Sequence, residues 1–578
     1  MARYLSPAKT CLLALVELYV EDAVPHDGAL PVLCFITSHL IDVDVDVDVA
    51  SFSNPRSSRD RWQKARDIVG LIASINDFEQ LLSPYSAATG LPGRRLWDVF
   101  LHKIWSIDSL HALHQFFDRL RLLLAKTKDE LSLLAASGWP PPTEGTRLSR
   151  NSPFGTFVRR SQLEFGRLRF SDVGELWKDF VKYRQPTASA WRRRNPAAGP
   201  LSFDSVLLAG EHEWGAATAD IAAVAYGDVL DENAARRLPA STDDLEILLE
   251  FQIDQMQRFG VRVPVKMRNE YSSLLKESYA VPSTSHYLRC LDAWRSGDYP
   301  TSYDYLHQYF DYTMHSSHRP FYQYALLTLA VLQAEFGCYK EAVDAMLETV
   351  STARENRDMT CLNYALNWLF HFGQAHPHLV KELESNSMLG SGKETLAFLR
   401  VKAKEAGMFS LWSAALLSEA KLCLANGDSI ATAVEYMVRS SQVLVERNIK
   451  YMVASQTALS IALWDRLGSA STTLMACRIF LMCHAPHSRV DDSLNITARL
   501  ASLQAGRGQY DEAMSLLENI DANALRTWKM NQYWRRYRGL LKVLRNLHRN
   551  DLDGADYLLS QLLQTQPDDL EADLVSRG

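Results

Sequence analysis

Cys477, Cys483, His484 and His487 form the densest group of metal-binding residue types in the sequence. Thiolate and imidazole are preferred zinc ligands, but structural zinc sites usually take them as two closely spaced pairs. The 578 residues contain no CxxC pair and no second cluster at the required spacing. The four residues also fall on an expected helix and the turn after it, where small and polar residues are ordinary. We therefore predict no metal site and no cofactor.

Residues that could support catalysis are equally sparse. The segment Gly390–Thr395 looks like a phosphate-binding loop, but Ser387 stands where that motif needs its first glycine. Glu394 stands where the hydroxyl residue after the lysine is required. No G-x-S-x-G, H-E-x-x-H or G-x-G-x-x-G motif occurs in the chain. We predict that the protein is not an enzyme.

Within residues 41–49, aspartate and valine alternate strictly after Ile41. An EF-hand loop that began at Asp42 would need glycine at its sixth position and glutamate at its twelfth. Val47 and Ser53 occupy those positions, so we exclude a calcium loop of this type. We interpret the run as a low-complexity, solvated insertion.

The overall composition narrows the possible class of protein. The net charge is −6 and the hydrophobic content 47%, which give enough apolar residues for a core but no basic field for nucleic acid. Eight cysteines are scattered along the chain, which favours reduced thiols. No apolar run approaches the ~20 residues of a membrane-spanning helix. We expect a soluble, intracellular protein that binds neither nucleic acid nor membrane.

A recurring turn organises the second half of the chain. Residues 337–342 (GCYKEA) and 508–513 (GQYDEA) agree at four of six positions, and weaker copies begin at Gly297 and Gly468. Glycine can end a helix in the left-handed conformation, and the small residue five positions later allows a second helix to approach closely. Neighbouring turns lie about 40 residues apart, near the ~34 of a tetratricopeptide (TPR) repeat. The residues that we assign to this repeat signature are Gly297, Tyr299, Gly337, Tyr339, Ala342, Gly468, Gly508, Tyr510, Ala513 and Ala555.

The pattern divides the chain into three parts, and the predicted fold class is all-α. Residues 1–184 form an N-terminal helical domain, residues 185–241 a linker or irregular insertion, and residues 242–578 a TPR-like α-solenoid. Ser6-Pro7 is a typical helix start. The expected helices of the first part are residues 7–19, 31–40, 61–83, 96–105, 108–136 and 149–183.

A TPR groove that binds a terminal carboxylate needs Lys and Asn on the first helix of each hairpin. Counting back from the turn glycines, these positions hold no Lys or Asn, and a carboxylate clamp is not expected. The position pairs are Tyr287/Leu291, Leu327/Val331, Ala458/Ala462 and Ala498/Ser502.

Two longer segments resemble a known family. His286–Thr313 and Phe321–Gln374 resemble the signature region of anaphase-promoting complex subunit 5, and Ser152–Phe170 resembles a second block of that family. The resemblance covers most of the chain and is strongest to fungal members. The Val-Asp run is a departure, and family members usually continue with further repeats past the point of Gly578. We therefore expect either a short isoform or an incomplete gene model.

The resemblance implies a non-catalytic scaffold subunit of a multi-subunit ubiquitin ligase that acts in mitosis and cell division. It implies contacts with the large scaffold subunit 1, the propeller subunit 4 and neighbouring TPR subunits. It further implies a nuclear location, with the cytoplasm as the alternative. The other functional hypothesis is a stand-alone TPR adaptor that recruits client proteins.

The last expected hairpin supplies a candidate partner-binding surface. Its second helix carries five apolar residues within nine positions, although a terminal repeat needs a polar outer face. The acidic tail beyond Pro567 is too short to form another hairpin. We predict that Leu559 and Leu563 are covered by further repeats or by a partner subunit.

Overall fold

The structure is a computed structural model that describes residues 4–40, 73–88, 94–126, 148–194, 241–277, 283–315, 322–376 and 392–564. These residues form helices, and their β-type contacts are limited to two isolated bridges, Ser86–Arg95 and Leu124–Leu148. The predicted all-α class is therefore confirmed. No described helix is long and apolar enough to cross a membrane.

The chain forms two compact units. The first comprises residues 1–251 and 266–282, and the second comprises residues 252–265 and 283–578. Helix α13 (Thr242–Phe259) contributes residues to both. The other helices of the first unit are α1 (Pro7–Val20), α2 (His26–Leu40), α4 (Ile75–Leu82), α5 (Leu96–Trp105), α6 (Leu110–Arg119), α8 (Pro153–Arg167), α9 (Phe170–Arg184), α10 (Ala188–Arg194) and α14 (Val265–Glu277).

Helix α1 is central to the first unit, since every residue from Pro7 to Leu18 is buried. The Ser6 hydroxyl caps its start by accepting a hydrogen bond from the amide of Lys9 at 3.3 Å. The Lys9 ammonium in turn lies 2.6 Å from Asp244 at the beginning of α13. Its charge is thus paired where the helix enters the core.

Several predicted helix boundaries in this unit are wrong. Helix α2 begins at His26, so Pro31 lies inside it. The helix expected over residues 108–136 ends at Arg119, because Leu123 and Ala125 instead exchange main-chain hydrogen bonds with Leu148. The helix expected over 149–183 is two helices, separated by extended backbone at Leu168. Apolar spacing continued across these breaks because the residues remain buried. Residues 41–72, which hold the Val-Asp run, lie outside the described residues.

The first ten residues of the expected linker are helical and packed, which differs from the irregular segment inferred from sequence. Thr187 is buried and accepts a hydrogen bond from Trp105 Nε1 at 3.0 Å. The ring of Trp191 on α10 stacks on that of Trp105, with an interplanar angle of 7°. These tertiary contacts hold the segment in place. It is too short to show the apolar periodicity by which a helix is predicted from sequence. Residues 195–240 lie outside the described residues.

Gly155 gives a test of packing at the start of α8. A Cβ placed there would lie 2.0 Å from the carbonyl oxygen of Ser149, which is backbone and cannot rotate away. We expect Gly155→Ala to lower the free energy of unfolding by about 1–3 kcal/mol. Gly166 in the same helix has no atom within 4 Å of its Cβ position. Gly166→Ala should therefore stabilise the helix by about 0.5–1 kcal/mol. Thermal denaturation of both variants measures the difference, and equal melting temperatures would contradict this packing.

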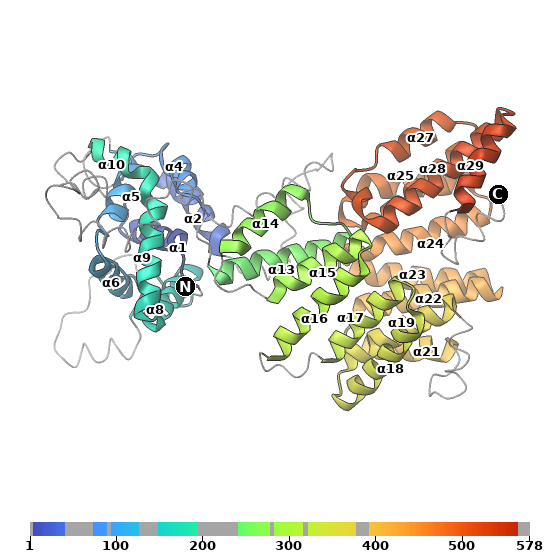
Figure 1. The fold of residues 1–578 in the computed structure, drawn as a ribbon, viewed down its shortest axis with the longest axis horizontal. Coiled ribbons are helices and arrows are strands. Elements are labelled where there is room, and N and C mark those ends of the chain that lie inside the picture. Colours follow the sequence, from blue (N-terminus) through green and yellow to red (C-terminus); the bar gives the residue numbers. More distant parts are fainter. Residues whose placement is uncertain are drawn as a thin grey trace. The chain divides into compact units, whose positions relative to one another are not determined.

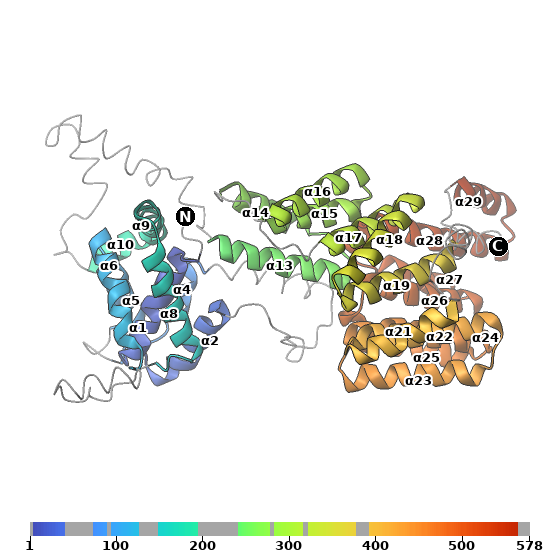
Figure 2. The same ribbon diagram turned by 90° about the horizontal axis from the view of Figure 1, so that it is seen from below.

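The second unit is a succession of antiparallel helical hairpins (Figures 1 and 2). The second helix of each hairpin packs against the first helix of the next, as expected of stacked repeats in a TPR-like solenoid. Its helices are α15 (Ser283–Ser296), α16 (Tyr299–His315), α17 (Tyr322–Glu335), α18 (Tyr339–Glu355), α19 (Met359–Ala375), α21 (Gly392–Glu405), α22 (Phe409–Asn426), α23 (Ile430–Glu446), α24 (Val453–Arg466), α25 (Ala470–Cys483), α26 (Val490–Gly506), α27 (Tyr510–Glu518), α28 (Trp528–His548) and α29 (Leu552–Gln564).

Candidate interaction surfaces of the repeat array

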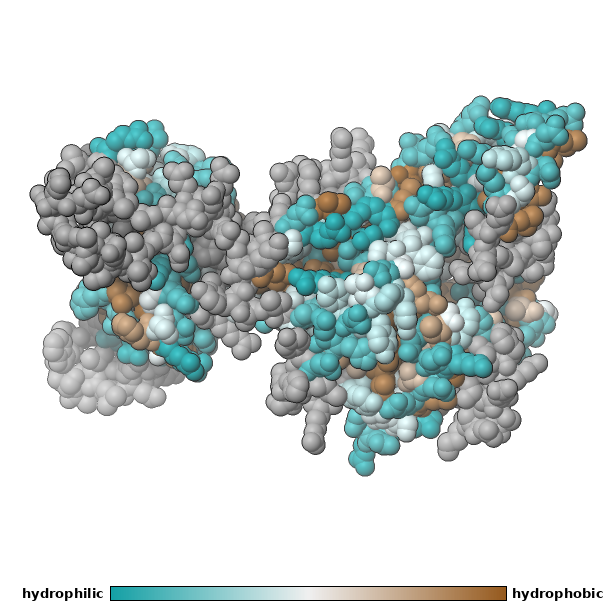
Figure 3. Space-filling model, in the orientation of Figure 1, coloured by the Kyte–Doolittle hydropathy of each residue, from teal (hydrophilic) through white to brown (hydrophobic). Residues whose placement is uncertain are grey.

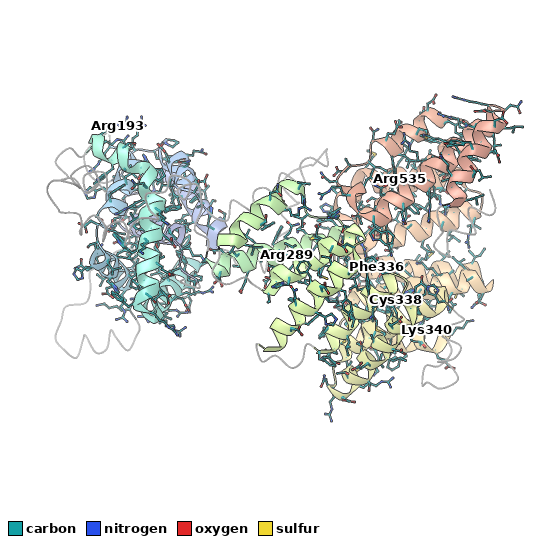
Figure 4. All side chains as sticks on the ribbon, in the orientation of Figure 1. Arg193, Arg289, Phe336, Cys338, Lys340 and Arg535 are labelled. Atoms are coloured by element: carbon teal, nitrogen blue, oxygen red, sulfur yellow. The ribbon has the colours of Figure 1, made fainter. Side chains whose placement is uncertain are left out.

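The four signature glycines all occupy turns inside hairpins. Gly297, Gly337, Gly468 and Gly508 have φ between +79° and +86°, a region that side chains with a Cβ rarely adopt. The residue after each glycine donates a main-chain hydrogen bond to the carbonyl five positions before it, at 3.0 or 3.1 Å. This is the Schellman pattern, which satisfies carbonyls at the helix end. Figure 4 shows Phe336, Cys338 and Lys340 around one such turn.

The signature tyrosines join one hairpin to the next. Tyr299 lies 5.1 Å from the ring of Phe336, and Tyr339 lies 5.9 Å from that of Phe372. Tyr510 contacts His548 in the same way, with its hydroxyl 3.1 Å from Nδ1. In each pair the tyrosine begins a second helix, and its partner lies at or just past the end of the first helix of the following hairpin. The tyrosine therefore fixes how neighbouring repeats stack.

The small-residue position of the signature lies in the tightest part of each hairpin. Ala342 and Ala513 have no exposed surface, and Ala555 is 4% exposed. Ser302 and Thr473 occupy the same position in weaker copies and are also fully buried. Their hydroxyls bond carbonyls of their own helices, at 2.8 and 2.9 Å, so the polar residues are satisfied.

The array curls until its last described hairpin touches its first. Trp528 at the start of α28 lies against the first turn, where a Cβ on Gly297 would be 3.1 Å from its ring. The ring of Phe336, just after α17, is nearly parallel to that of Trp528, with centroids 6.1 Å apart. The next residue, Lys529, pairs with Glu335 at 2.9 Å. We call these five residues the closure contact, and Figure 1 shows α28 reaching α15 there.

Two arginines add long-range hydrogen bonds beside the closure contact. Arg526 donates to the carbonyl of Val263 at 2.9 Å, and Arg295 donates to that of Gly260 at 2.7 Å. Burial lowers the pKa of Arg295, and the nearby carboxylate of Asp491 on α26 opposes that effect. Arg295 belongs to the first hairpin, and its charge thus lies close to α26, a helix near the end of the array.

The last described hairpin exposes large apolar side chains. On α28, Leu544 and Leu547 are 46% and 43% exposed. On α29, Leu552 and Leu563 are 61% and 60% exposed. We call these four leucines the open face. Figure 3 shows hydrophobic residues scattered among hydrophilic ones on the surface of the second unit. Single exposed leucines are ordinary, whereas four on one hairpin form an apolar patch.

Both helices of the hairpin present their leucines on the same side. The two helices meet where Gly539 of α28 faces Leu562 of α29. Counting about 100° per residue from these contact positions, each leucine pair lies roughly 100° further round in the same sense. Because the helices are antiparallel, equal rotations bring both stripes to one face. Leu559, predicted with Leu563 to bind a partner, is half-buried and lies at the inner edge of this face.

The cysteine and histidine group examined in the sequence does not converge. Cys477 is fully buried in an apolar cluster with Phe480 and Ile496, whereas Cys483 is exposed at the end of the same helix. Burial raises the pKa of the Cys477 thiol to about 11, which disfavours the thiolate that a metal requires. Among the described residues, no three His, Cys, Asp or Glu side chains are placed to hold a metal ion.

The assumed groove register is wrong at two positions. Leu291 and Ala498, counted from the turns as groove residues, are 4% and 0% exposed. The sequence reasoning also gave no sign of a polar hollow of about 210 Å³ between α26 and α28, whose lining includes Asn495, Lys529 and Arg536.

Comparison with known proteins bears on the same elements. The family model for anaphase-promoting complex subunit 5 matches residues 286–376, which span the hairpins from α15 to α19. The subunit 5 protein of Schizosaccharomyces pombe is 25% identical over 96% of this chain and 68% of its own length. The chain is related to anaphase-promoting complex subunit 5. The resemblance inferred from the sequence is thus confirmed.

Vertebrate members of the subunit 5 family match less of the chain. The human protein is 22% identical over 72% of this chain, and the rat protein 25% over 47%. The chain spans about half the length of the human relative, 52%. The matched hairpins include the closure residues Gly297, Glu335 and Phe336, whereas Trp528 and Lys529 lie outside the family-model match.

Proposed function

We propose that this chain is a non-catalytic scaffold subunit of the anaphase-promoting complex named in its relatives, and that this complex acts as a cell-cycle ubiquitin ligase. The observation that carries the proposal is the relationship to subunit 5 over 96% of the chain. The open face supports it, because subunits of permanent assemblies bury apolar surface against their neighbours. As partners we propose the large scaffold subunit 1, the propeller subunit 4 and neighbouring TPR subunits, in the nucleus.

Purification from the organism that encodes the chain tests this function. The tagged chain should recover the other subunits of the complex in near-equal amounts, as mass spectrometry would show. Recovery of a monomer with assorted client proteins would instead support the stand-alone TPR adaptor. Imaging of the same tagged chain should show nuclear enrichment.

The open face provides a sharper test of the scaffold role. We expect Leu552→Glu together with Leu563→Glu to reduce the recovery of partner subunits at least tenfold, because two carboxylates would be desolvated at the interface. The isolated chain should keep its melting temperature, since both leucines are already about 60% exposed.

Tyr557→Glu is the matched control on the same helix. Tyr557 is 64% exposed but lies roughly 140° round α29 from Leu552, outside the open face. This variant should assemble normally. Leu559→Glu with Leu563→Glu should also reduce recovery, with some loss of stability because Leu559 is half-buried. Normal assembly of both leucine pairs would show that the open face binds no subunit.

A further inference from the structure

Helix α28 carries an unusual charge for this chain. Its 21 residues include six Lys or Arg and no carboxylate, although the whole chain has a net charge of −6. The helix is also poorly covered, because Leu541 and Val543 are its buried residues. It therefore exposes a second side besides the open face.

This second side of α28 is exposed because the neighbouring helix α27 is short. Helix α27 has 9 residues, whereas the other second helices of the array have between 13 and 17. Its last residue, Glu518, reaches Arg538 in the middle of α28 at 2.8 Å. Helix α29 packs at the adjacent residue, Gly539, about 100° further round α28. The outward side of α28 between these two neighbours is left uncovered.

Three cations occupy that side at regular spacing. Arg535, Lys542 and Arg549 recur every seven residues, which places them on one face about 10.5 Å apart. Arg535, on α28 in Figure 4, and Arg549 are exposed, and Lys542 is half-buried. We call these three residues the cationic line.

The cationic line has no counter-charge within the described residues. No described carboxylate lies within 4 Å of any of its three members, while the nearby Glu518 already pairs with Arg538. Beside the line, the buried Nε of Arg545 also lacks a hydrogen-bond partner among the described residues. Because this Nε is itself buried, an incoming carboxylate would pair with the three cations of the line instead.

We propose that the cationic line docks an acidic segment of a partner protein, in helical form. Carboxylates seven residues apart on a helix have the same 10.5 Å pitch as the line. Nucleic acid fits less well, because each strand carries a phosphate every 3.4 Å of axis, and the chain's net negative charge repels a long polyanion. The surface is independent of the open face, and the proposal holds whichever complex the chain enters.

The test uses the full chain and a fluorescein-labelled alanine-rich peptide of about 18 residues, with glutamate at every seventh position. Fluorescence anisotropy should show binding that weakens with salt, and a peptide with glutamine in place of glutamate should bind at least tenfold more weakly. Arg535→Glu, Lys542→Glu and Arg549→Glu together should reduce the affinity for the glutamate peptide at least tenfold.

A matched control distinguishes binding at the cationic line from a general electrostatic attraction between the peptide and the chain. Lys340→Glu, Arg354→Glu and Arg478→Glu change the net charge equally at exposed positions elsewhere in the array and should leave the affinity within twofold. Arg535→Gln, Lys542→Gln and Arg549→Gln, with unchanged circular dichroism, guard against misfolding and should also weaken binding.

Three results would overturn the proposal. One is absence of glutamate-peptide binding to the folded chain. Another is an equal loss of affinity in the control triple variant. The third is tighter binding of single-stranded DNA of similar length that the cationic-line variants abolish, which would make the line a nucleic-acid surface.

Discussion

Arg184→Ala is expected to lower the free energy of unfolding of the N-terminal unit by about 3–5 kcal/mol. The Arg184 side chain is buried, and its Nη1 donates to the carbonyls of Ile104 and Ile107 at 3.2 and 2.6 Å. Its guanidinium also lies over the ring of Trp105, 4.5 Å from the centroid. Alanine would leave two carbonyls unpaired and a cavity beneath an aromatic ring.

The pKa of Arg184 reflects the free-energy cost of burying its charge, which these contacts offset. Burial lowers it to about 10, and Asp108 opposes the shift by favouring the charged form. The charged form is therefore costly to bury and persists because donors and ring contacts compensate it. Arg184→Lys should recover part of the stability, since one ammonium cannot reproduce the planar geometry over Trp105.

Hydrogen exchange of the full chain measures this effect locally. Peptides from α5 and α9 should lose protection in Arg184→Ala, while peptides from the repeat array should not change. Arg193→Ala is the control, because Arg193 is exposed on α10. Equal exchange in the two variants would show that Arg184 does not hold the two helices together.

Ala342→Arg is expected to lower the free energy of unfolding of the repeat array by about 3–5 kcal/mol. Ala342 has no exposed surface where α18 approaches α17, so a long side chain cannot be accommodated without separating the helices. Its charge would also be buried without a partner. Ala513→Arg should act similarly between α26 and α27.

Asp344→Arg on the same helix is the matched control, because Asp344 is exposed and arginine suits a helix. Thermal denaturation followed by circular dichroism should show a lower melting temperature for Ala342→Arg alone. Unchanged melting of both alanine variants would place the helix contact elsewhere and contradict the repeat register.

Local features were predictable from sequence because each depends on residues close together in the chain. Ser6 and Pro7 define the start of α1, and the turn glycines have the left-handed backbone that such glycines favour. The breaks at Leu120 and Leu168 were missed, because buried residues keep helical spacing through a short turn. Helix α10 is too short to show periodicity.

The interaction surfaces were only partly predictable. Leu563 is exposed, but its role in binding a partner stays a prediction. That Leu544 and Leu547 lie on the same face as Leu563 became visible only when α28 and α29 were placed together. The closure contact has no local signal, since Phe336 and Trp528 are widely separated and their residue types are ordinary in a core. The seven-residue spacing of Arg535, Lys542 and Arg549 was present in the sequence and could have been found.

The closure contact can form only late in the synthesis of the chain. Phe336 and Glu335 leave the ribosome roughly 190 residues before Trp528 and Lys529, which at ~5–20 residues per second is a delay of roughly 10–40 s. Isolated hairpins form in far less than a second, so the first repeats are complete long before α28 exists to cover them. During that interval Tyr299 already packs against the ring of Phe336, but the side that Trp528 later covers is exposed on the nascent chain. A chaperone that shields aromatic side chains would have its longest opportunity at this position.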